Sequence, residues 1–569
     1  MVIAQPQREM TARTDNPRRA VLIGAGIGLL LWIGVATLVA PSVIESAYRG
    51  HSLPALNAII QHRADHPVEY YLNKWNRMAV QFSLIGLASL LLGAASTTSA
   101  FFRRFVGDAS PQALGAIRLI ACGTLLVATW LEDLASVALL PAEMRHAGGS
   151  VHLLFSMPIG FEAFVASASA LRTLQRFTEL FLFLGMIGCG TRLMIPLAAA
   201  AHFLALGILV DYSFFWHQNL VPLYVLLVLS FAPCGDGLSI DRWWAQHRGR
   251  PVRERDWAVY GWARYLCWVV IVLPYVQSGL AKLRMAGWSW WNATNMRSML
   301  YLDTLSPREF DWHVALNLVS APDALFTALG VATIVLEVSY VLVLFSRTAR
   351  RILPWLMVGV HLGILLLQRI LFLDLILLQL VFVDVGGLRA ALRRRGDAAV
   401  PAGIRFRFAA AFSAVVFVAA TCWLQRVEFF PFSAWHLYAM NDTSGRITYY
   451  KVVGHYDSGR IASARLEDGI GALALDSRYS VALDKCFGSA DAVSICEKFL
   501  VANATAYNAH RPPGTRLTHY EIQTWTWDFL SNPRDPDYGR LQQRFVVGAT
   551  GTGDFRQRLR VAERSAEIQ

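Results

Sequence analysis

The chain has 569 residues, of which 55% are hydrophobic and 16% are charged, and its mean hydropathy is +0.40. This composition excludes an ordinary soluble globular protein. The formal net charge is +12, yet the stretch from Glu428 to the end carries 16 basic and 16 acidic residues, so the whole excess falls in residues 1–427. Because that first part is apolar, we attribute its positive charge to cytoplasmic loops and not to nucleic-acid binding.

Apolar runs recur along residues 1–427, and most are close to the ~20 residues that a helix needs to cross a bilayer. They predict about eleven transmembrane helices, at 20–40, 77–96, 113–140, 173–190, 193–213, 219–234, 258–285, 322–346, 353–371, 372–385 and 406–426. The first run follows several arginines, as in a signal peptide, but it is long and ends without a cleavage motif. We therefore expect an uncleaved anchor there.

Arginine-rich loops predict the orientation of the chain. With the N-terminus inside, every even-numbered loop is cytoplasmic, and these loops hold Arg103, Arg104, Arg192, Arg242, Arg248, Arg250, Arg253, Arg255, Arg347, Arg350, Arg351, Arg389, Arg393, Arg394, Arg395 and Arg405. An odd number of spans then places the C-terminal part outside. We predict a multi-pass protein of the cell inner membrane with a cytoplasmic N-terminus and an extracytoplasmic C-terminal domain.

One outer connection is unusual for a loop. Residues 141–172 are strongly apolar and contain Gly148, Gly149, Pro158 and Gly160. We expect this segment to re-enter the membrane or to lie on its surface.

The character of the chain changes near residue 428. RITYYKVVGHY (446–456) and RLTHYEIQTWTWDFL (516–530) alternate like half-buried strands, and DAVSICEKFLVANATAYNAH (491–510) has helical spacing. The fold class predicted is an all-α polytopic membrane bundle followed by a small α+β domain. We divide the chain into a two-helix membrane segment (1–111), a main transmembrane domain (112–385), a basic cytoplasmic loop with the last transmembrane helix (386–427) and the extracytoplasmic domain (428–569).

The seven cysteines show no spacing typical of a metal site, and no metal is expected. Only Cys486 and Cys496 fall in the C-terminal domain. If that domain lies outside the cytoplasm, an oxidising compartment permits a disulfide between them. Two reduced, buried cysteines are the alternative.

Ionisable residues inside apolar runs are costly and usually face the interior of a bundle. They are Arg118, Glu132, Asp133, Glu179, His202, Glu337 and His361. Two interpretations stay open for them: hydrogen bonds between helices that only hold the bundle together, or a polar cavity that could carry protons. For the set as a whole we favour a cavity.

Lys282 lies near the outer end of a long apolar run, just before a group of tryptophans. In one interpretation it is an interfacial anchor whose amine reaches the headgroups, with Trp288, Trp290 and Trp291 forming an aromatic belt. Charge and hydropathy alone are compatible with this interpretation.

In the other interpretation the Lys282 amine is reactive. Ser278 and Gly279 lie four and three residues earlier on the same helix face, and Tyr275 lies one turn further back. A helical side chain leans toward the N-terminus, so the amine would lie over these small residues. A desolvated amine in such a place can act as a base or a nucleophile. We predict an outward-facing polar pocket with His217 at its mouth.

Several motifs, taken in order, resemble a known family. They are LGAIRLIACGTLL with Arg118, GCGTRL with Arg192, FFWHQNLVPLYVLLVLSFAPCGDGLSIDRWW with His217, Ser239 and Asp241, YVQSGLAKLRMAGW with Lys282, and then Glu337 and His361 on successive helices. Residues 112–385 resemble the transmembrane domain of vitamin K-dependent γ-carboxylases and their bacterial relatives, the HTTM family. The C-terminal domain shows no such resemblance, and two extra spans precede the matching region.

In the γ-carboxylases the matching lysine is regarded as the base that deprotonates vitamin K hydroquinone, whose oxidation by O₂ drives the carboxylation of glutamate. The resemblance implies similar chemistry at the outer membrane face, with a quinone or hydroquinone as cofactor. Joined with the helix-face argument, it predicts catalytic roles for Lys282 and His217. Together they predict cofactor binding by Tyr275, Ser278, Gly279, Glu337 and His361.

Two other functions stay open. A non-enzymatic scaffold would bind a partner protein through the C-terminal domain, and a quinone redox protein of the DoxX-like kind is suggested by ELFLFLGMIGCGTRL (179–193). An enzyme predicts a lipid-accessible cavity on which Lys282, His217 and the intramembrane polar residues converge. A scaffold predicts that these groups point apart or pair with one another. Membrane lipids are the expected surroundings in each case.

Overall fold

The computed structural model describes residues 17–52, 66–213, 217–249, 255–307, 310, 312–383, 400–471, 476–549 and 558–560. The predicted cytoplasmic arginines at 250, 253, 389 and 393–395 lie outside these residues. Contacts within the chain separate two units. The first comprises Met1–Ala109, Asp256–Trp262 and Ala390–Thr421, and the second comprises Ser110–Arg255, Ala263–Arg389 and Cys422–Gln569.

Helices dominate the residues described, and eight are long and apolar enough to cross a membrane. These are Gly26–Tyr48 (most of α1, then η1 and α2), Val68–Ser96 (α4), Pro111–Leu131 (α6), Thr191–Tyr212 (α9), Ala258–Met285 (α12), Asp323–Phe345 (α14 and α15), Arg347–Gln368 (α16) and Ala402–Gln425 (α19). This agrees with a polytopic membrane protein.

The predicted count of about eleven spans is not confirmed. Of the other three predicted spans, α8 (Ala168–Ile187) is long but carries Arg172, Arg176 and Glu179. The other two, α10 (Leu220–Ser230) and the pair α17 (Leu373–Leu378) and η9 (Gln379–Phe382), are apolar but short.

Shorter elements complete the described chain. The helical ones are α1 (Pro17–Gly34), η1 (Val35–Val39), α2 (Ala40–Tyr48), α5 (Ser99–Phe101), η2 (Phe102–Val106), η3 (Leu134–Leu139), η4 (Ala142–Met144), η5 (Ser150–Ser156), α7 (Phe161–Val165), η6 (Cys234–Asp236), α11 (Ile240–His247), η7 (Gly287–Trp291), α13 (Ala293–Leu305), η8 (Val314–Leu318), α14 (Asp323–Ser339), α15 (Leu342–Phe345), η10 (Leu466–Asp468), α20 (Asp476–Lys485) and α21 (Ala490–Asn508). The strands are β1 (Glu428–Phe429), β2 (Phe432–Ser433), β3 (Arg446–Tyr456), β4 (Ile461–Ser463), β5 (Leu517–Asp528), β6 (Arg540–Gly548) and β7 (Arg558–Arg560).

In the first unit, the N-terminal helices pack with the last transmembrane helix. Arg405 of α19 donates to the Thr97 carbonyl at 2.9 Å, just past the end of α4. Gly93 lies against Ser413 and the Ala409 carbonyl so closely that it has no room for a side chain. By contact, therefore, α19 groups with the two-helix segment that precedes the main transmembrane domain.

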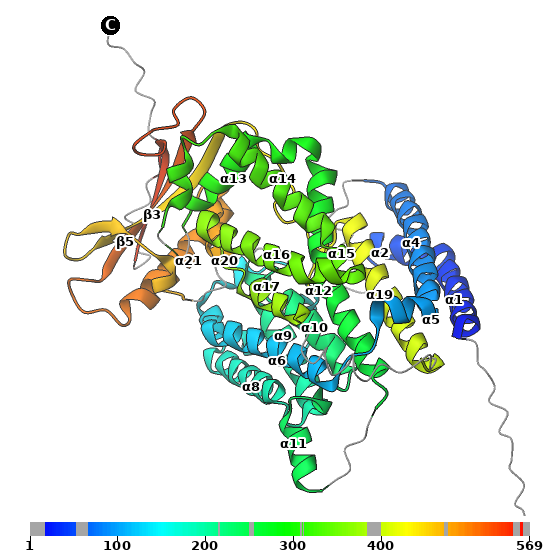
Figure 1. The fold of residues 1–569 in the computed structure, drawn as a ribbon. Coiled ribbons are helices and arrows are strands. Elements are labelled where there is room, and N and C mark those ends of the chain that lie inside the picture. The colour runs from blue at the N-terminus through cyan, green and yellow to red at the C-terminus, as the bar shows by residue number, and fades with distance from the viewer. Residues whose placement is uncertain are drawn as a thin grey trace, which may run out of the picture. The chain divides into compact units, whose positions relative to one another are not determined.

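In the second unit, α6, α8 and α9 lie side by side (Figure 1). Arg118 of α6 is fully buried and donates to the carbonyls of Met186, Cys234 and Leu238, which belong to two different turns. Asp241 bridges the same two turns by accepting from the backbone of Gly190 and Thr191. Arg118 therefore holds together the end of α8 and the turn that precedes α11.

Residues 141–165 form short helical turns joined to the C-terminal domain. The Ser150 amide donates to the Phe430 carbonyl at 2.8 Å, and the Phe430 amide donates to the Gly148 carbonyl at 3.0 Å. Glu143 forms an ion pair with Lys498 of α21. This part of the segment predicted to lie at the membrane surface thus contacts the domain that follows the last span.

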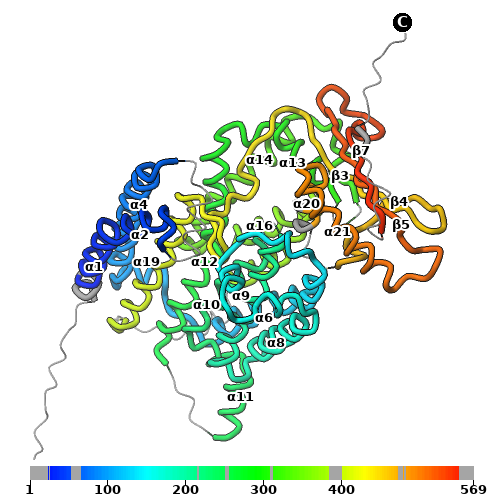
Figure 2. Tube along the Cα trace, turned by 180° about the vertical axis from the view of Figure 1, so that it is seen from behind, coloured from blue at the N-terminus to red at the C-terminus, as the bar shows by residue number. Residues whose placement is uncertain are grey.

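The C-terminal domain contains an antiparallel five-stranded sheet in the order β4-β3-β5-β6-β7. Both predicted strands and the predicted helix are confirmed as β3, β5 and α21. Where β3 and β5 pair, Ile447 and Trp527 join a buried apolar cluster with Tyr301 of α13. Figure 2 shows α13 beside β3 and α21 beside β5. The sheet thus packs against α13, which in turn packs against α14 and α16.

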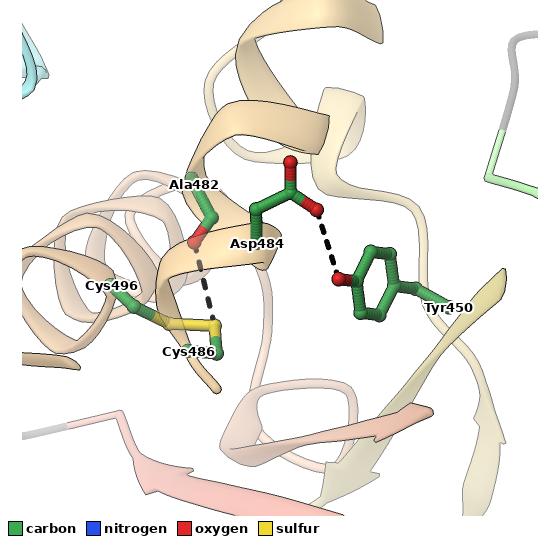
Figure 3. The surroundings of a disulfide bond; sticks show 5 residues. All are labelled: Tyr450, Ala482, Asp484, Cys486 and Cys496. Atoms are coloured by element: carbon green, nitrogen blue, oxygen red, sulfur yellow. Dashed lines mark hydrogen bonds between the residues drawn. A yellow bond between two sulfur atoms is a disulfide. The ribbon is translucent and has the colours of Figure 1, made fainter. Parts of the chain in front are cut away.

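Cys486, just after α20, and Cys496 on α21 form a disulfide with Cα atoms 5.1 Å apart (Figure 3). Beside it, the Tyr450 hydroxyl of β3 donates to Asp484 at 2.9 Å, so this corner is attached to the sheet.

Replacing both cysteines by serine is expected to lower the free energy of unfolding of the C-terminal domain by roughly 2–3 kcal/mol, because the bridge closes a short loop in the unfolded chain. Chemical denaturation of the purified protein with and without reductant measures this loss. Two reactive thiols at these positions in protein unfolded without reductant would contradict the bridge.

Candidate functional site

A pocket of about 390 Å³ lies in the second unit, among α12, α13, α14, α16 and α17. Most of its lining is apolar, but Lys282, Glu337, His361 and Tyr275 all contribute to its wall. Pockets that bind small molecules typically combine an apolar lining with a few polar groups that converge on the ligand. This pocket is therefore the candidate site.

Lys282 is buried in the pocket wall and forms an ion pair. Its side chain is 5% exposed, and its Nζ donates to both carboxylate oxygens of Glu337, each at 2.9 Å. The same amine donates to the Ser278 hydroxyl at 2.7 Å, one turn earlier on α12. The tryptophan-belt interpretation is wrong for this amine: it faces the interior, with the Trp290 ring centroid 5.3 Å away.

Gly279, predicted to bind the cofactor, is not among the residues that line the pocket. A Cβ at this position would lie 2.9 Å from the Glu337 Cβ and 2.9 Å from a Val338 methyl group. The missing side chain lets α12 and α14 touch at this point. Gly279 thereby sets the distance across which Lys282 reaches Glu337.

A second polar group lies one helical turn further back on α12. The Tyr275 hydroxyl and His361 Nε2 are 2.9 Å apart, and Gln379 Nε2 donates to the same hydroxyl at 2.9 Å. Either the hydroxyl or His361 Nε2 donates in this contact. The other ring nitrogen of His361, Nδ1, is buried and has no hydrogen-bond partner among the residues described.

One side of the pocket is lined by the segment that follows β2. Trp435 and Tyr438 line the pocket, and both have left-handed backbone with φ of 56° and 50°. The Tyr438 hydroxyl donates to Asp303 at 3.2 Å, and Trp290 Nε1 donates to the Tyr438 carbonyl at 2.6 Å. Conformations of this kind are rarely adopted by residues with side chains and are held only where the surroundings fix them.

His217 is not at the pocket mouth, which corrects the predicted catalytic position. Its Nε2 lies 2.7 Å from the Ser433 hydroxyl and 3.2 Å from a Glu428 carboxylate oxygen. Its ring lies 4.8 Å from the Trp435 ring, and it is Trp435 that lines the pocket. His217 therefore lies one layer behind the wall, as a residue that positions Trp435.

The intramembrane ionisable residues do not converge on one cavity. Glu337 and His361 line the main pocket, whereas His202 and Glu132 line a separate small cavity of about 40 Å³. Arg118 instead holds together the two turns described above. The prediction of a polar cavity thus applies to only part of the set.

Sequence reasoning did not identify Gln379, Trp435 or Tyr438 as site residues. Gln379 is the one polar residue of the short apolar helix η9, and this isolated amide was the only feature that could have pointed to it. Trp435 and Tyr438 follow the last span, and nothing in local periodicity connects them to α12. Among the residues described, no group of three or more histidine, cysteine or acidic residues could hold a metal ion.

Comparisons of the chain with protein-family models, curated proteins and solved structures found no match. Membership of the HTTM family therefore remains a prediction from the sequence motifs. What can be said about the function follows from the pocket and from the polar groups in its wall.

Proposed function

We propose that the pocket binds a lipid-soluble quinol and that the Lys282–Glu337 pair takes up a proton from it. The observation that carries the proposal is a buried amine–carboxylate pair in the wall of an otherwise apolar pocket. An apolar lining suits the ring and tail of such a molecule, while the ion pair and His361 suit its oxygens. A quinol supplies two acidic hydroxyl groups and two electrons that O₂ can accept.

The pairing of Lys282 with Glu337 changes the role that the family resemblance implied. Because the Lys282 Nζ already donates to both carboxylate oxygens of Glu337 at 2.9 Å, we assign the role of proton acceptor to the carboxylate and not to the amine. The Glu337 carboxylate can instead accept a proton from a ligand hydroxyl. The Lys282 ammonium, released from its full pairing, then balances the negative charge left on the ligand oxygen.

A non-enzymatic scaffold is the alternative that one observation favours, because mutual pairing of Lys282 and Glu337 is what a purely structural role predicts. The pocket beside the pair is the reason to prefer a binding function. The DoxX-like alternative has less support, since residues 179–193 do not contribute to the pocket lining. Their turn instead contacts Arg118 and Asp241.

Oxygen consumption tests the proposed function, because a deprotonated quinol reacts faster with O₂. Protein in lipid nanodiscs supplied with a tailed ubiquinol analogue is expected to accelerate O₂ uptake by about 10²–10⁴-fold, the range usual for a positioned proton acceptor. Glu337→Gln should abolish this acceleration, and Arg284→Met on the exposed side of α12 should retain it. Equal rates with and without the wild-type protein would refute the proposal.

The proposed site lies on the outer face only if the C-terminal domain is extracytoplasmic. Within the second unit, the connections after α6 and α12 both contact that domain, through Lys498 and through Trp527. The turns around Gly190 and Asp241, which precede α9 and α12, contact each other instead. The connections after α6 and α12 thus lie on one side with the C-terminal domain, and the turns before α9 and α12 lie on the other. This arrangement supports the orientation proposed from the arginine-rich loops, with eleven crossings and the C-terminal domain outside.

A reporter enzyme active only outside the cytoplasm tests the orientation. Fused to the C-terminus it is expected to be active, and inserted within residues 248–255 it is expected to be silent, since that loop is rich in arginine. Activity in both fusions, or the reverse pattern, would be incompatible with eleven alternating crossings.

A further inference from the structure

The wall of the pocket includes residues that are exposed on the sides of membrane-spanning helices. Ala332 of α14 and Gly359 of α16 are both exposed and both line the pocket, as does Leu356, which is 46% exposed. All three lie well inside helices that are long and apolar enough to cross a membrane. A residue that both lines a pocket and faces outward marks an opening, and this opening lies between α14 and α16.

Glycines on α16 leave that opening clear. A Cβ added at Gly359 or at Gly363 would meet no heavy atom within 4 Å. The two residues are four apart and therefore lie one above the other on the same helix face. Two other helix glycines of the second unit serve close packing: at Gly279 and Gly330 an added Cβ would approach its nearest neighbour to 2.9 and 2.7 Å. Gly359 and Gly363 thus create space that no protein atom fills.

The pocket wall also holds a buried imidazole nitrogen, His361 Nδ1, that has no hydrogen-bond partner among the residues described. His361 is 95% buried, since its exposed fraction is 5%. A buried nitrogen without a partner costs free energy, which a ligand oxygen would recover. The pocket therefore has polar groups on its inner wall and an apolar opening on its side.

We infer that the ligand enters sideways from the bilayer, between α14 and α16, and that it carries an apolar tail. The polar head reaches Lys282, Glu337 and His361, and the tail extends over Gly359 and Gly363 into the surrounding lipid. The identity of the head rests on the proposed function, whereas the lateral entry rests on the opening alone. A head without a tail would leave the space beside the glycines unfilled.

A phospholipid with a diazirine in its acyl chain tests the entry route without assuming any ligand. In nanodiscs, light should attach the probe to the Glu337 and Tyr275 side chains, which line the pocket behind the opening. Val335, 57% exposed on α14, serves as an internal reference that is labelled from the bilayer in every variant. Fragment mass spectrometry reads each residue separately.

The double variant Gly359→Leu and Gly363→Leu fills the opening. It is expected to lower labelling of Glu337 and Tyr275 at least tenfold relative to Val335, without unfolding, because both positions are open and leucine favours helix over glycine. Gly403→Leu is the matched control, since it also has open space and lies outside the pocket. Absent labelling of Glu337 in the wild type, or equal labelling in the double variant, would overturn lateral entry.

Binding of the tailed ubiquinol analogue separates this inference from the proposed function. If acyl chains reach Glu337 but the quinol does not bind, the entry route stands and the quinol head is wrong. If the quinol binds equally well to the wild type and to the double leucine variant, the function stands and the placement of the tail over Gly359 and Gly363 is wrong. Both inferences hold together if the double variant loses acyl-chain labelling and quinol binding in parallel.

Discussion

Replacing Lys282 by methionine is expected to destabilise the protein by about 3–5 kcal/mol, because the Glu337 carboxylate would be left buried without its cation. Glu337→Met should have a comparable effect, since it leaves the Lys282 ammonium buried without its carboxylate partner. The double variant with methionine at both positions should regain most of the loss, because an apolar pair of similar volume removes both buried charges. Thermal unfolding in nanodiscs and the yield of monodisperse protein measure all three.

The matched control is Arg284→Met, two residues along α12. Arg284 is exposed and donates to the carbonyls of Trp423 and Leu424, so its loss should cost less than about 1 kcal/mol. Additive losses in the double variant would mean that Lys282 and Glu337 are not coupled. Lys282→Arg adds a chemical test: retained activity would show that a positive charge suffices at this position.

The second large effect is expected at Arg118. Its replacement by methionine leaves the carbonyls of Met186, Cys234 and Leu238 without their buried donor. Each buried group left unsatisfied costs about 1–3 kcal/mol, so the total loss should reach at least about 3 kcal/mol. The variant should accumulate poorly and melt earlier than the wild type.

Arg176→Met on α8 provides the comparison for Arg118. Its side chain is 68% exposed and pairs with Glu179 at 2.7 Å. Because water surrounds most of the Arg176 side chain, this pair should contribute only about 0–1 kcal/mol, and the variant should behave like the wild type. Equal stability of the two arginine variants would contradict the structural role assigned to Arg118.

The helix face around Lys282 could be predicted from the sequence because it depends on the period of a single helix. Tyr275, Ser278 and Lys282 are spaced by three and four residues, and the structure places all three in the pocket wall. The same reasoning placed Gly279 in the site, but a glycine has no side chain to show its role. Only its contact with α14 reveals that it serves packing.

The partner of Lys282 could not be derived from periodicity. Glu337 lies 55 residues further along, and the two meet because α12 and α14 touch at Gly279. That register depends on packing between helices, which no local pattern encodes. The motif resemblance grouped Glu337 and His361 with Lys282, and the geometry brings all three to one pocket.

His217 was misplaced for a related reason. It begins the stretch before α10 and was predicted at the pocket mouth, but Trp435 from the segment after the last span intervenes. Contacts between a transmembrane bundle and a following domain depend on long-range packing. The C-terminal strands themselves could be predicted, because alternation along β3 and β5 is a local property.

Equilibrium binding of a tailed ubiquinol analogue to protein in nanodiscs tests whether the pocket and its Lys282–Glu337 pair bind a quinol. The wild type is compared with the variant that carries methionine at both Lys282 and Glu337, which should fold but lack the polar pair. We expect saturable binding to the wild type and at least about tenfold weaker binding to the double variant, equivalent to about 1.4 kcal/mol. Undiminished binding to a folded double variant, or no binding to the wild type, would contradict the proposed function.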